Sequence, residues 1–272
     1  MKKSLSELQD IARKSRILIL KMVHKANAGH FGGPFSTIDM LTALYFHKMN
    51  YDLKNPAWPD RDRFVLSAGH KCAALYATLM QFGAIPATAW ESFRQLGSPL
   101  QGHPKLNLEY GIEMSTGSLG QGNSVANGMA LAARVAKKNY RTYSLESDGG
   151  SQEGMFWEAC MFAGHYKLSN RCILVDHNNV QIDGFVSDVM GVEPYTDKLR
   201  AFNWHVISID GHDMAQICAA LDEAEKITDK PTAIVGKTIM GKGVSIFENK
   251  PKYHGVPPTD EELAVALKEL GN

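Results

Sequence analysis

The sequence has no excess of charge of either sign, because Lys and Arg together number 29 and so do Asp and Glu. A chain without net charge has no overall attraction for nucleic acid or for an anionic membrane surface, so we expect neither as a partner. Long apolar runs are also missing. The longest one near the N-terminus, Ile17 to Leu20, is far too short for a signal-peptide core or a membrane span. These absences indicate a soluble cytoplasmic protein.

Cysteine is scarce, and its pattern excludes two kinds of site. No two cysteines form a C-x-x-C pair, which argues against a zinc site and against a disulfide framework. Each cysteine falls in a segment that we predict to be a helix or a strand, where it serves as a small core residue in a reducing compartment. The four are Cys72, Cys160, Cys172 and Cys218.

Internal repeats, low-complexity tracts and linkers are absent from the 272 residues. We therefore predict a single domain over residues 1–272, long enough to bury a large core. One long loop, over residues 97–117, interrupts the regular patterns, and a loop of this length in a compact domain is usually functional or mobile.

Helical and extended patterns alternate along the chain. We predict helices over residues 4–24, 36–46, 72–82, 88–96, 123–137, 153–167, 195–202, 215–227 and from Thr259 onward. We predict strands over residues 61–70, 142–145, 171–175, 205–209 and 232–235. Capping boxes open the first and last helices at Ser4 and Thr259, and Ser36 is expected to cap the second. This alternation predicts an α/β fold with a doubly wound, mostly parallel sheet and helices on both faces.

Polar side chains follow two strands of the predicted sheet. Asp148 comes in a Ser-Asp-Gly-Gly turn after the strand at 142–145, and Asn178 comes in a polar turn at 176–179 after the next strand. The helix between them makes a right-handed crossover, so both side chains project at the carboxyl edge of a parallel sheet, where such sheets bind ligands. A carboxylate and an amide oxygen beside glycines suit a divalent cation that holds a diphosphate.

Four histidines lie in glycine-containing turns, one of them at the very end of the strand predicted over residues 61–70. They are His30, His70, His103 and His254. Together they would supply neutral donors and acceptors for sugar hydroxyls, or proton transfer near neutral pH. No H-x-x-x-H pair supports a zinc site among them.

The spacing of Asp148-Gly149 and Asn178-Asn179 resembles the thiamine diphosphate signature G-D-G…N-N, with Ser147 in place of the first glycine. Other segments agree with it in order and spacing. They are Ala26 to His30, Arg61 to His70, Gly102 to Pro104, Ser115 to Gly122, and His254. Over nearly its whole length the chain resembles the diphosphate-binding domain of transketolases.

This resemblance implies a set of cofactor-binding and metal-binding residues. Asp148, Asn178 and the carbonyl of Val180 would hold Mg²⁺ or Ca²⁺. Thiamine diphosphate would be bound by His70, Gly117, Ser118, Leu119, Asp148, Gly149, Gly150, Glu153, Asn178 and His254.

The same resemblance implies roles for the histidines and for two acidic residues. His70 and His254 would act near the diphosphate and the reacting centre, and His30 and His103 near the hydroxyls of the donor sugar. Glu153 and Glu158 match acidic residues that line a water-filled contact between paired active sites in this family. The implied reaction passes a two-carbon ketol unit from a ketose or its phosphate to an aldose or its phosphate.

Transketolases continue into a pyrimidine-binding domain, whose glutamate forms the reactive cofactor tautomer, and this chain ends at Asn272. We therefore expect the N-terminal subunit of a split transketolase. A C-terminal partner subunit would supply the missing domain in an α2β2 heterotetramer.

Three alternatives are compatible with parts of the sequence. The first is a subunit of another thiamine diphosphate enzyme, similar to 1-deoxyxylulose-phosphate synthase or to a dehydrogenase. The second is a nucleotide-binding Rossmann oxidoreductase, suggested by Gly117-x-x-Gly120-x-Gly122 before a helix, although its glycine order departs from G-x-G-x-x-G. The third is a non-catalytic thiamine-binding module. The identity of the sugar stays open among pentose phosphates, other ketose phosphates and sulfosugars.

Overall fold

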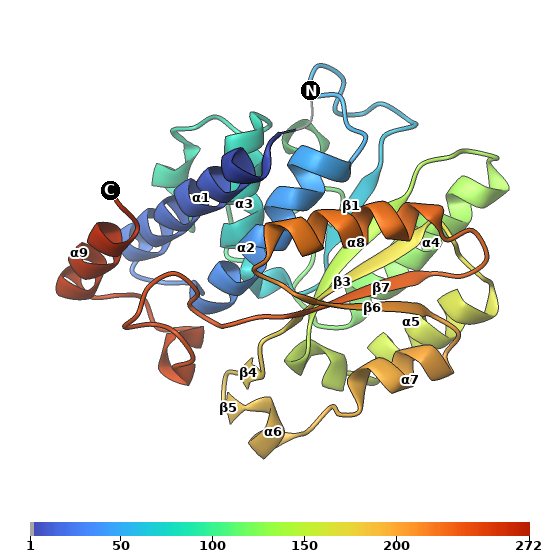
Figure 1. Ribbon diagram of the computed structural model, residues 1–272. Coiled ribbons are helices and arrows are strands. Elements are labelled where there is room, and N and C mark those ends of the chain that lie inside the picture. Colours follow the sequence, from blue (N-terminus) through green and yellow to red (C-terminus); the bar gives the residue numbers. More distant parts are fainter. Residues whose placement is uncertain (1–2) are drawn as a thin grey trace.

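The computed structural model describes residues 3–272, and its centre is a five-stranded sheet in the order β1-β2-β3-β7-β6 (Figure 1). All neighbouring strands in this sheet run parallel. The strands are β1 (Arg63–Leu66), β2 (Thr142–Ser147), β3 (Arg171–His177), β6 (His205–Asp210) and β7 (Thr232–Lys237). The predicted doubly wound α/β fold is thus confirmed.

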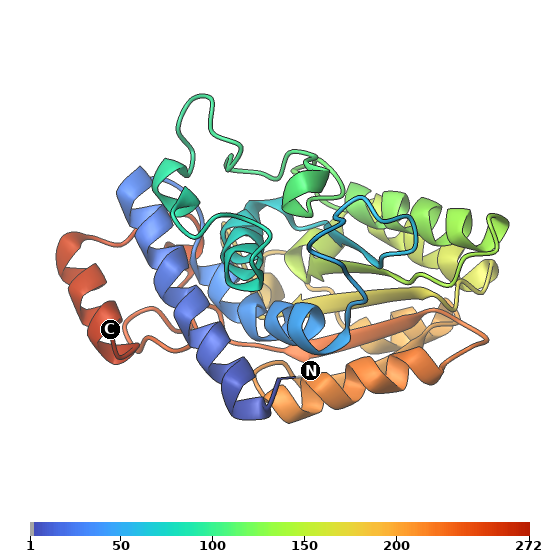
Figure 2. The same cartoon turned by 90° about the horizontal axis from the view of Figure 1, so that it is seen from above.

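Helices cover both faces of this sheet, as Figures 1 and 2 show. One face carries α1 (Leu5–Ala26), α2 (Gly32–Ala43), α3 (Cys72–Phe82) and α8 (Met214–Lys226), and the other carries α4 (Gln121–Val135), α5 (Gly154–His165) and α7 (Tyr195–Ala201). Strand β3 serves both layers because its side chains alternate: Cys172 and Leu174 belong to the first core, and Ile173 and Val175 to the second.

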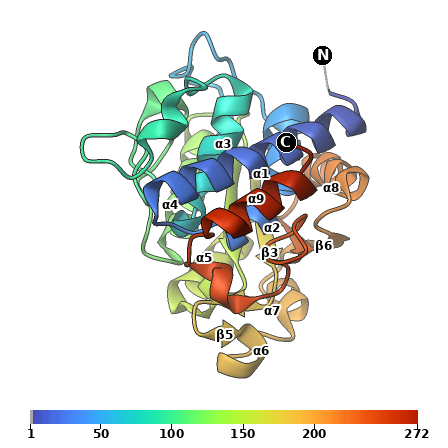
Figure 3. The ribbon, with the colours of Figure 1, turned by 90° about the vertical axis from the view of Figure 1, so that its left-hand side faces the viewer.

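Smaller elements complete the fold. A hairpin of β4 (Val180–Gln181) and β5 (Gly184–Phe185) follows the end of β3 and leads into the single turn α6 (Val186–Val189). The last helix, α9 (Asp260–Glu269), lies against α1 (Figure 3). Within residues 3–272 we find no helix with the length and apolar character needed to cross a membrane.

Several predicted elements agree closely with the structure. Helix α3 has the predicted bounds, and both capping boxes are formed, with Ser4 paired to Glu7 and Thr259 to Glu262. All four cysteines are buried, as predicted for small core residues.

The predicted cap at Ser36 is wrong. Helix α2 already begins at Gly32, and Pro34 fits its first turn because an N–H there would have no helical partner anyway. Ser36 lies inside the helix, where its hydroxyl donates to the Gly33 carbonyl. The helix then continues beyond Ala43 as a π-helical turn at Leu44–Lys48.

Three other boundaries also differ from the prediction. Strand β1 ends at Leu66 rather than at His70, because the chain turns at Gly69–Lys71, where Gly69 packs on the backbone near Gly117 too closely for a Cβ. Strand β3 continues through His177, since its ladder with β7 extends that far. The helix predicted over 88–96 is only a 3₁₀ turn at Ala89–Ser92, because Arg94 adopts a positive φ.

Candidate active site

A cavity of about 420 Å³ lies at the carboxyl edge of the sheet. Strand ends and loops from widely separated parts of the sequence meet there, as expected for a parallel sheet. Of the predicted site residues, its lining includes His30, His70, His103, Gly117, Leu119, Gly149, Gly150, Glu153, Asn178, Val180 and His254.

Three of the four predicted histidines form one cluster in this cavity. The ring centroids of His30 and His70 are 5.2 Å apart, and both rings lie 5.4 Å from that of His254. The buried nitrogens His30 Nδ1, His70 Nε2 and His254 Nδ1 have no hydrogen-bond partner anywhere in residues 3–272. Because buried polar atoms are nearly always bonded, these nitrogens indicate a place where a ligand completes the structure.

Burial keeps this histidine cluster uncharged. It lowers the pKa of His30 and of His254 to about 4, with smaller contributions from neighbouring positive groups. Burial and the adjacent Lys71 lower the pKa of His70 well below its usual value. A neutral imidazole carries one donor and one acceptor nitrogen, so near pH 7 the cluster can orient hydroxyl groups or exchange a proton.

Asp148 lies directly below the cavity, fully buried at the end of β2. Its Oδ1 accepts a hydrogen bond from the Gly149 N–H at 2.9 Å, and its Oδ2 accepts one from the Asn179 N–H at 2.5 Å. Burial, followed by the nearby Asp176, raises the pKa of this carboxyl to about 6. Within residues 3–272 no lysine or arginine forms an ion pair with Asp148, so an added cation would relieve an unfavourable buried charge.

The amide of Asn178 is held in one orientation. Its Nδ2 donates to Asp176 Oδ2 at 2.7 Å and to Ser36 Oγ at 3.2 Å, while its Oδ1 accepts from the Val180 N–H at 2.8 Å. Asp176 is itself fixed by a buried ion pair with Lys71 and by a hydrogen bond from Ser36. The amide oxygen is therefore turned away from Asp176, with a lone pair left for another partner.

These residues fit a hard divalent cation. A carboxylate, an amide oxygen and a backbone carbonyl are the ligand types that Mg²⁺ and Ca²⁺ take in proteins, and Asp148, Asn178 and Val180 offer them. In the part of the chain that the structure describes, no group of three or more His, Cys, Asp or Glu side chains is arranged to hold a metal ion. The site thus favours an oxygen-bound cation over zinc.

Comparison with known proteins identifies the family. The family model described as "Transketolase, thiamine diphosphate binding domain" matches residues 8–272. The chain belongs to the transketolase family. This membership removes the support for a nucleotide-binding oxidoreductase.

Two relatives of similar length are themselves parts of larger enzymes. The chain is 43% identical to the 6-deoxy-6-sulfo-D-fructose transketolase subunit SqwG of Clostridium sp. (strain MSTE9), covering 97% of this chain and 96% of that one. It is 40% identical to one of the apulose-4-phosphate transketolase subunits of Phocaeicola vulgatus, covering 97% and 93%.

Solved transketolases are longer. The structure from Campylobacter jejuni superimposes with a TM-score of 0.92 at 38% identity, covering 99% of this chain but 43% of that one. The structure from Leishmania mexicana gives 0.91 at 33% identity, covering 100% and 42%. The chain thus spans less than half the length of these transketolases.

Three predicted site residues lie outside the cavity lining, and one of them, Asp148, is buried between the lining residues Ser147 and Gly149. Ser118 is turned toward the start of α4, where its hydroxyl accepts a hydrogen bond from Gln121 Nε2 at 3.0 Å. Glu158 is exposed on α5, one helical turn beyond the cavity residue Glu153.

Sequence reasoning missed several lining residues. Lys71 follows His70 directly, but a lysine after a strand reads as a solvent-exposed charge rather than a buried one. Gln181 and Ile182 lie on the hairpin after β3, which is too short to leave a periodic pattern. Gln152 lies in the turn before α5 and hydrogen-bonds Gln181 at 2.5 Å.

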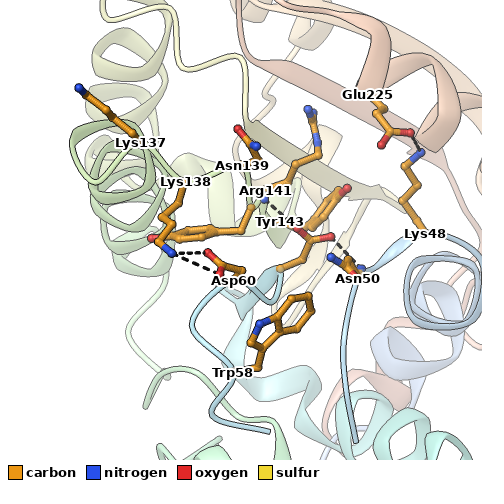
Figure 4. Close-up of a pocket in the computed structure, with 12 residues that line it drawn as sticks. Lys48, Asn50, Trp58, Asp60, Lys137, Lys138, Asn139, Arg141, Tyr143 and Glu225 are labelled. Carbon is orange, nitrogen blue, oxygen red and sulfur yellow. Dashed lines mark hydrogen bonds and ion pairs between the residues drawn. The ribbon is translucent and has the colours of Figure 1, made fainter. Parts of the chain in front are cut away.

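A second hollow of about 400 Å³ lies at the amino edge of the sheet (Figure 4). Two of its lysines are paired, Lys138 with Asp60 at 2.9 Å and Lys48 with Glu225, whereas the buried Arg141 Nε has no hydrogen-bond partner in residues 3–272. Asp62 accepts hydrogen bonds from backbone N–H groups at 2.7 and 2.9 Å. None of the predicted site residues lines this hollow.

Proposed function

We propose that this chain, as one diphosphate-binding domain over residues 1–272, is the N-terminal subunit of a split transketolase. It works with thiamine diphosphate and Mg²⁺ or Ca²⁺ and transfers a two-carbon ketol unit from a ketose to an aldose. The observation that carries the proposal is a cluster of neutral histidines with unbonded nitrogens that lines the same cavity as Asn178 and Val180, with Asp148 buried between the lining residues Ser147 and Gly149.

The chain's own residues divide into cofactor holders and proton carriers. Asp148, Asn178 and the Val180 carbonyl would hold the cation, and the turn at Gly149 and Gly150 lets diphosphate oxygens approach the backbone. When bound, thiamine diphosphate supplies the electron sink for the carbanion chemistry. Leu119 gives the cavity an apolar wall, and Gly117 packs closely against the ring of His103, which a Cβ there would approach to 3.3 Å.

The histidines orient the sugar and move its protons. His70 and His254 lie together and are uncharged near pH 7, so either can accept a proton from a hydroxyl and later return it. His30 and His103 line the same cavity, where their nitrogens can bond donor-sugar hydroxyls. Because each imidazole donates at one nitrogen and accepts at the other, the cluster suits a polyhydroxylated substrate.

A partner subunit would complete the site. Large apolar side chains are exposed on α4, on α5 and near the cavity mouth, in contrast with a surface that otherwise scatters such residues. They include Val125, Met155, Met161, Phe162, Ile182 and Met190. This surface suits a C-terminal subunit that brings the pyrimidine-binding domain, in an α2β2 assembly with Glu153 and Glu158 toward its interior.

The substrate is proposed to carry an acidic group. The two relatives of similar length are named for 6-deoxy-6-sulfo-D-fructose and for apulose 4-phosphate, both of which bear one. Ketose and aldose phosphates are therefore the first compounds to test. The proposed location is cytoplasmic, with no nucleic acid as partner.

The test is ketol transfer by the purified chain, alone and mixed with the polypeptide encoded beside it, in the presence of thiamine diphosphate and Mg²⁺. We expect activity only in the mixture, with a fixed stoichiometry of the two chains. Transfer by this chain alone at the rate of the mixture would contradict the split-subunit proposal. Cofactor binding without transfer by any mixture would favour a non-catalytic module.

A further inference from the structure

Glu146 is a fully buried acidic residue of β2 that belongs to neither the predicted metal ligands nor the cavity lining. Its Oε1 accepts a hydrogen bond from the Ser147 N–H at 2.9 Å. Its Oε2 accepts from Ser67 Oγ at 2.6 Å and from Asn123 Nδ2 at 3.0 Å. The backbone N–H of Asn123 donates in turn to the Gly120 carbonyl at 3.3 Å.

These bonds join the two segments proposed to hold the cofactor. Ser147 opens the turn that contains Asp148 and Gly149, and Asn123 lies in the first turn of α4, directly after the loop that contains Gly117 and Leu119. The turn also packs directly on the carboxyl group, since a Cβ on Gly150 would collide with Glu146 Oε1. One side chain thus supports the diphosphate side and the aminopyrimidine side of the proposed site.

A buried polar network holds Glu146 in turn. Asn123 Oδ1 accepts from Ser144 Oγ at 2.7 Å and from Arg171 Nη2 at 3.0 Å. Arg171 is fully buried, and its Nε donates to Asn127 Oδ1 at 3.1 Å. Asn123 therefore bridges a buried carboxyl group and a buried guanidinium. Such a network tolerates few rearrangements, because moving any member leaves another without a partner.

We propose that Glu146 is a positioning residue that fixes the turn at 147–150 and the loop at 117–120 relative to each other before the cofactor binds. The proposal rests on the proposed function, since it concerns thiamine diphosphate at the same site. Shape alone would not require a carboxyl group here, because an apolar side chain could fill the same volume. The Ser147 N–H and the side-chain amide of Asn123, however, need an acceptor, and Glu146 provides it.

Glu146→Gln tests this role with almost no change in size. Neither orientation of the new amide satisfies the site. An NH₂ group in place of Oε1 would oppose the Ser147 N–H, and in place of Oε2 it would oppose the Asn123 amide, whose orientation Arg171 fixes. We expect the variant to fold but to displace one of the two segments.

The measurement is calorimetric titration with thiamine diphosphate and Mg²⁺ of the parent chain and the variant, each with the partner subunit. We expect affinity to fall at least about tenfold in Glu146→Gln, as for other residues that orient ligating groups. Ser67→Ala is the matched control, because it removes one bond to Glu146 but none to the two segments, and it should bind within about twofold of the parent.

Binding by Glu146→Gln within about twofold of the parent would overturn the proposal. No binding by the parent would instead contradict the proposed function, so the two failures are distinguishable. Hydrogen exchange of the cofactor-free parent decides the matter if the variant does not fold. The Ser147 and Asn123 backbone amide protons should already be protected, and exchange at the unprotected rate until cofactor is added would overturn the inference.

Discussion

Two hollows of similar volume, about 420 and 400 Å³, lie at opposite edges of the same sheet, and they differ in how their polar groups are satisfied. At the carboxyl edge, three histidine nitrogens have no partner in residues 3–272, and Asp148 is buried without an ion pair there. At the amino edge, Lys138 is paired with Asp60 (Figure 4), and Asp62 accepts two backbone N–H groups, although the buried Arg141 Nε has no partner in residues 3–272. A cluster of unsatisfied buried nitrogens, rather than volume, therefore distinguishes the carboxyl-edge cavity.

The difference follows from the direction of the strands. At the carboxyl edge of a parallel sheet the chain leaves each strand into a loop whose length is free, so polar residues can be gathered there without disturbing the core. The amino edge receives the chain as it returns from the helices, and ion pairs such as Lys138 with Asp60 hold these returning segments together. The following predictions test this contrast, from the largest expected effect to the smallest.

Asp148→Ala should abolish Mg²⁺-dependent binding of thiamine diphosphate, because it removes the only carboxylate among the proposed ligands. The chain should stay folded, since Asp148 lies at the end of a strand and its carboxyl oxygens accept hydrogen bonds from only two backbone N–H groups of neighbouring turns. Calorimetry and circular dichroism check the two parts. Asp60→Ala at the amino edge is the control and should bind cofactor as the parent does. Unfolding of Asp148→Ala would show that the residue is structural.

Lys71→Met should lower the free energy of unfolding by about 3–5 kcal/mol, because it leaves Asp176 buried and unpaired. Urea denaturation measures the change. The double variant Lys71→Met with Asp176→Asn removes both charges and should recover most of the loss. If the single variant were as stable as the parent, the buried ion pair would not anchor the Asn178 side of the site.

Stability should fall as the pH drops from about 6.5 toward about 4. The pKa of His30 and of His254 is about 4 in the folded chain, whereas an unfolded histidine binds its proton near pH 6.5. In this interval the unfolded state takes up protons that the folded state does not, so stability is full above pH 6.5 and is lost below it. Asp148, with a pKa raised to about 6, acts in the opposite sense.

The pH effect is measured as the urea midpoint between pH 4 and pH 7 for the parent and for a His30→Asn, His254→Asn variant. The difference between the two curves isolates the histidines, because Asp148 contributes to both. We expect the variant to lose less stability on acidification. Parallel curves would contradict the assignment of buried, uncharged histidines.

Lys138→Met should change the free energy of unfolding by no more than about 1 kcal/mol and leave ketol transfer unaffected, because its ion pair with Asp60 is exposed at the amino edge. Urea denaturation and the transfer assay check both statements. A large loss of ketol transfer in this variant would mean that the amino-edge hollow takes part in function, and it would contradict the difference drawn here between the two hollows.

The sequence predicted the fold well where a local signal is strong. The capping residues Ser4 and Thr259 mark helix starts by their own chemistry, and the uninterrupted apolar pattern at Cys72–Phe82 gave the bounds of α3. The helix predicted over 88–96 failed because Arg94 takes a positive φ, which residue type alone does not reveal.

The candidate ligands were predictable because they too have a local sequence signal. The buried residues that hold these ligands in place were not predictable. Asp148 and Asn178 lie in turns after strands, and a polar residue that follows an apolar strand segment is easy to recognise in a sequence. Glu146 and Lys71 look like ordinary surface charges in the sequence, because their partners Ser67 and Asp176 lie far away along the chain. Burial of such residues is set by tertiary packing, which no local pattern encodes.

The most direct test of the central claim is calorimetric titration of this chain with thiamine diphosphate, with and without Mg²⁺, alone and with its partner subunit. The account predicts binding that requires the metal, is lost in Asp148→Ala, and becomes tighter when the partner is present. Metal-independent binding, or no binding under any of these conditions, would contradict this account. Asp148 and Asn178 would then be turn-forming residues and not metal ligands.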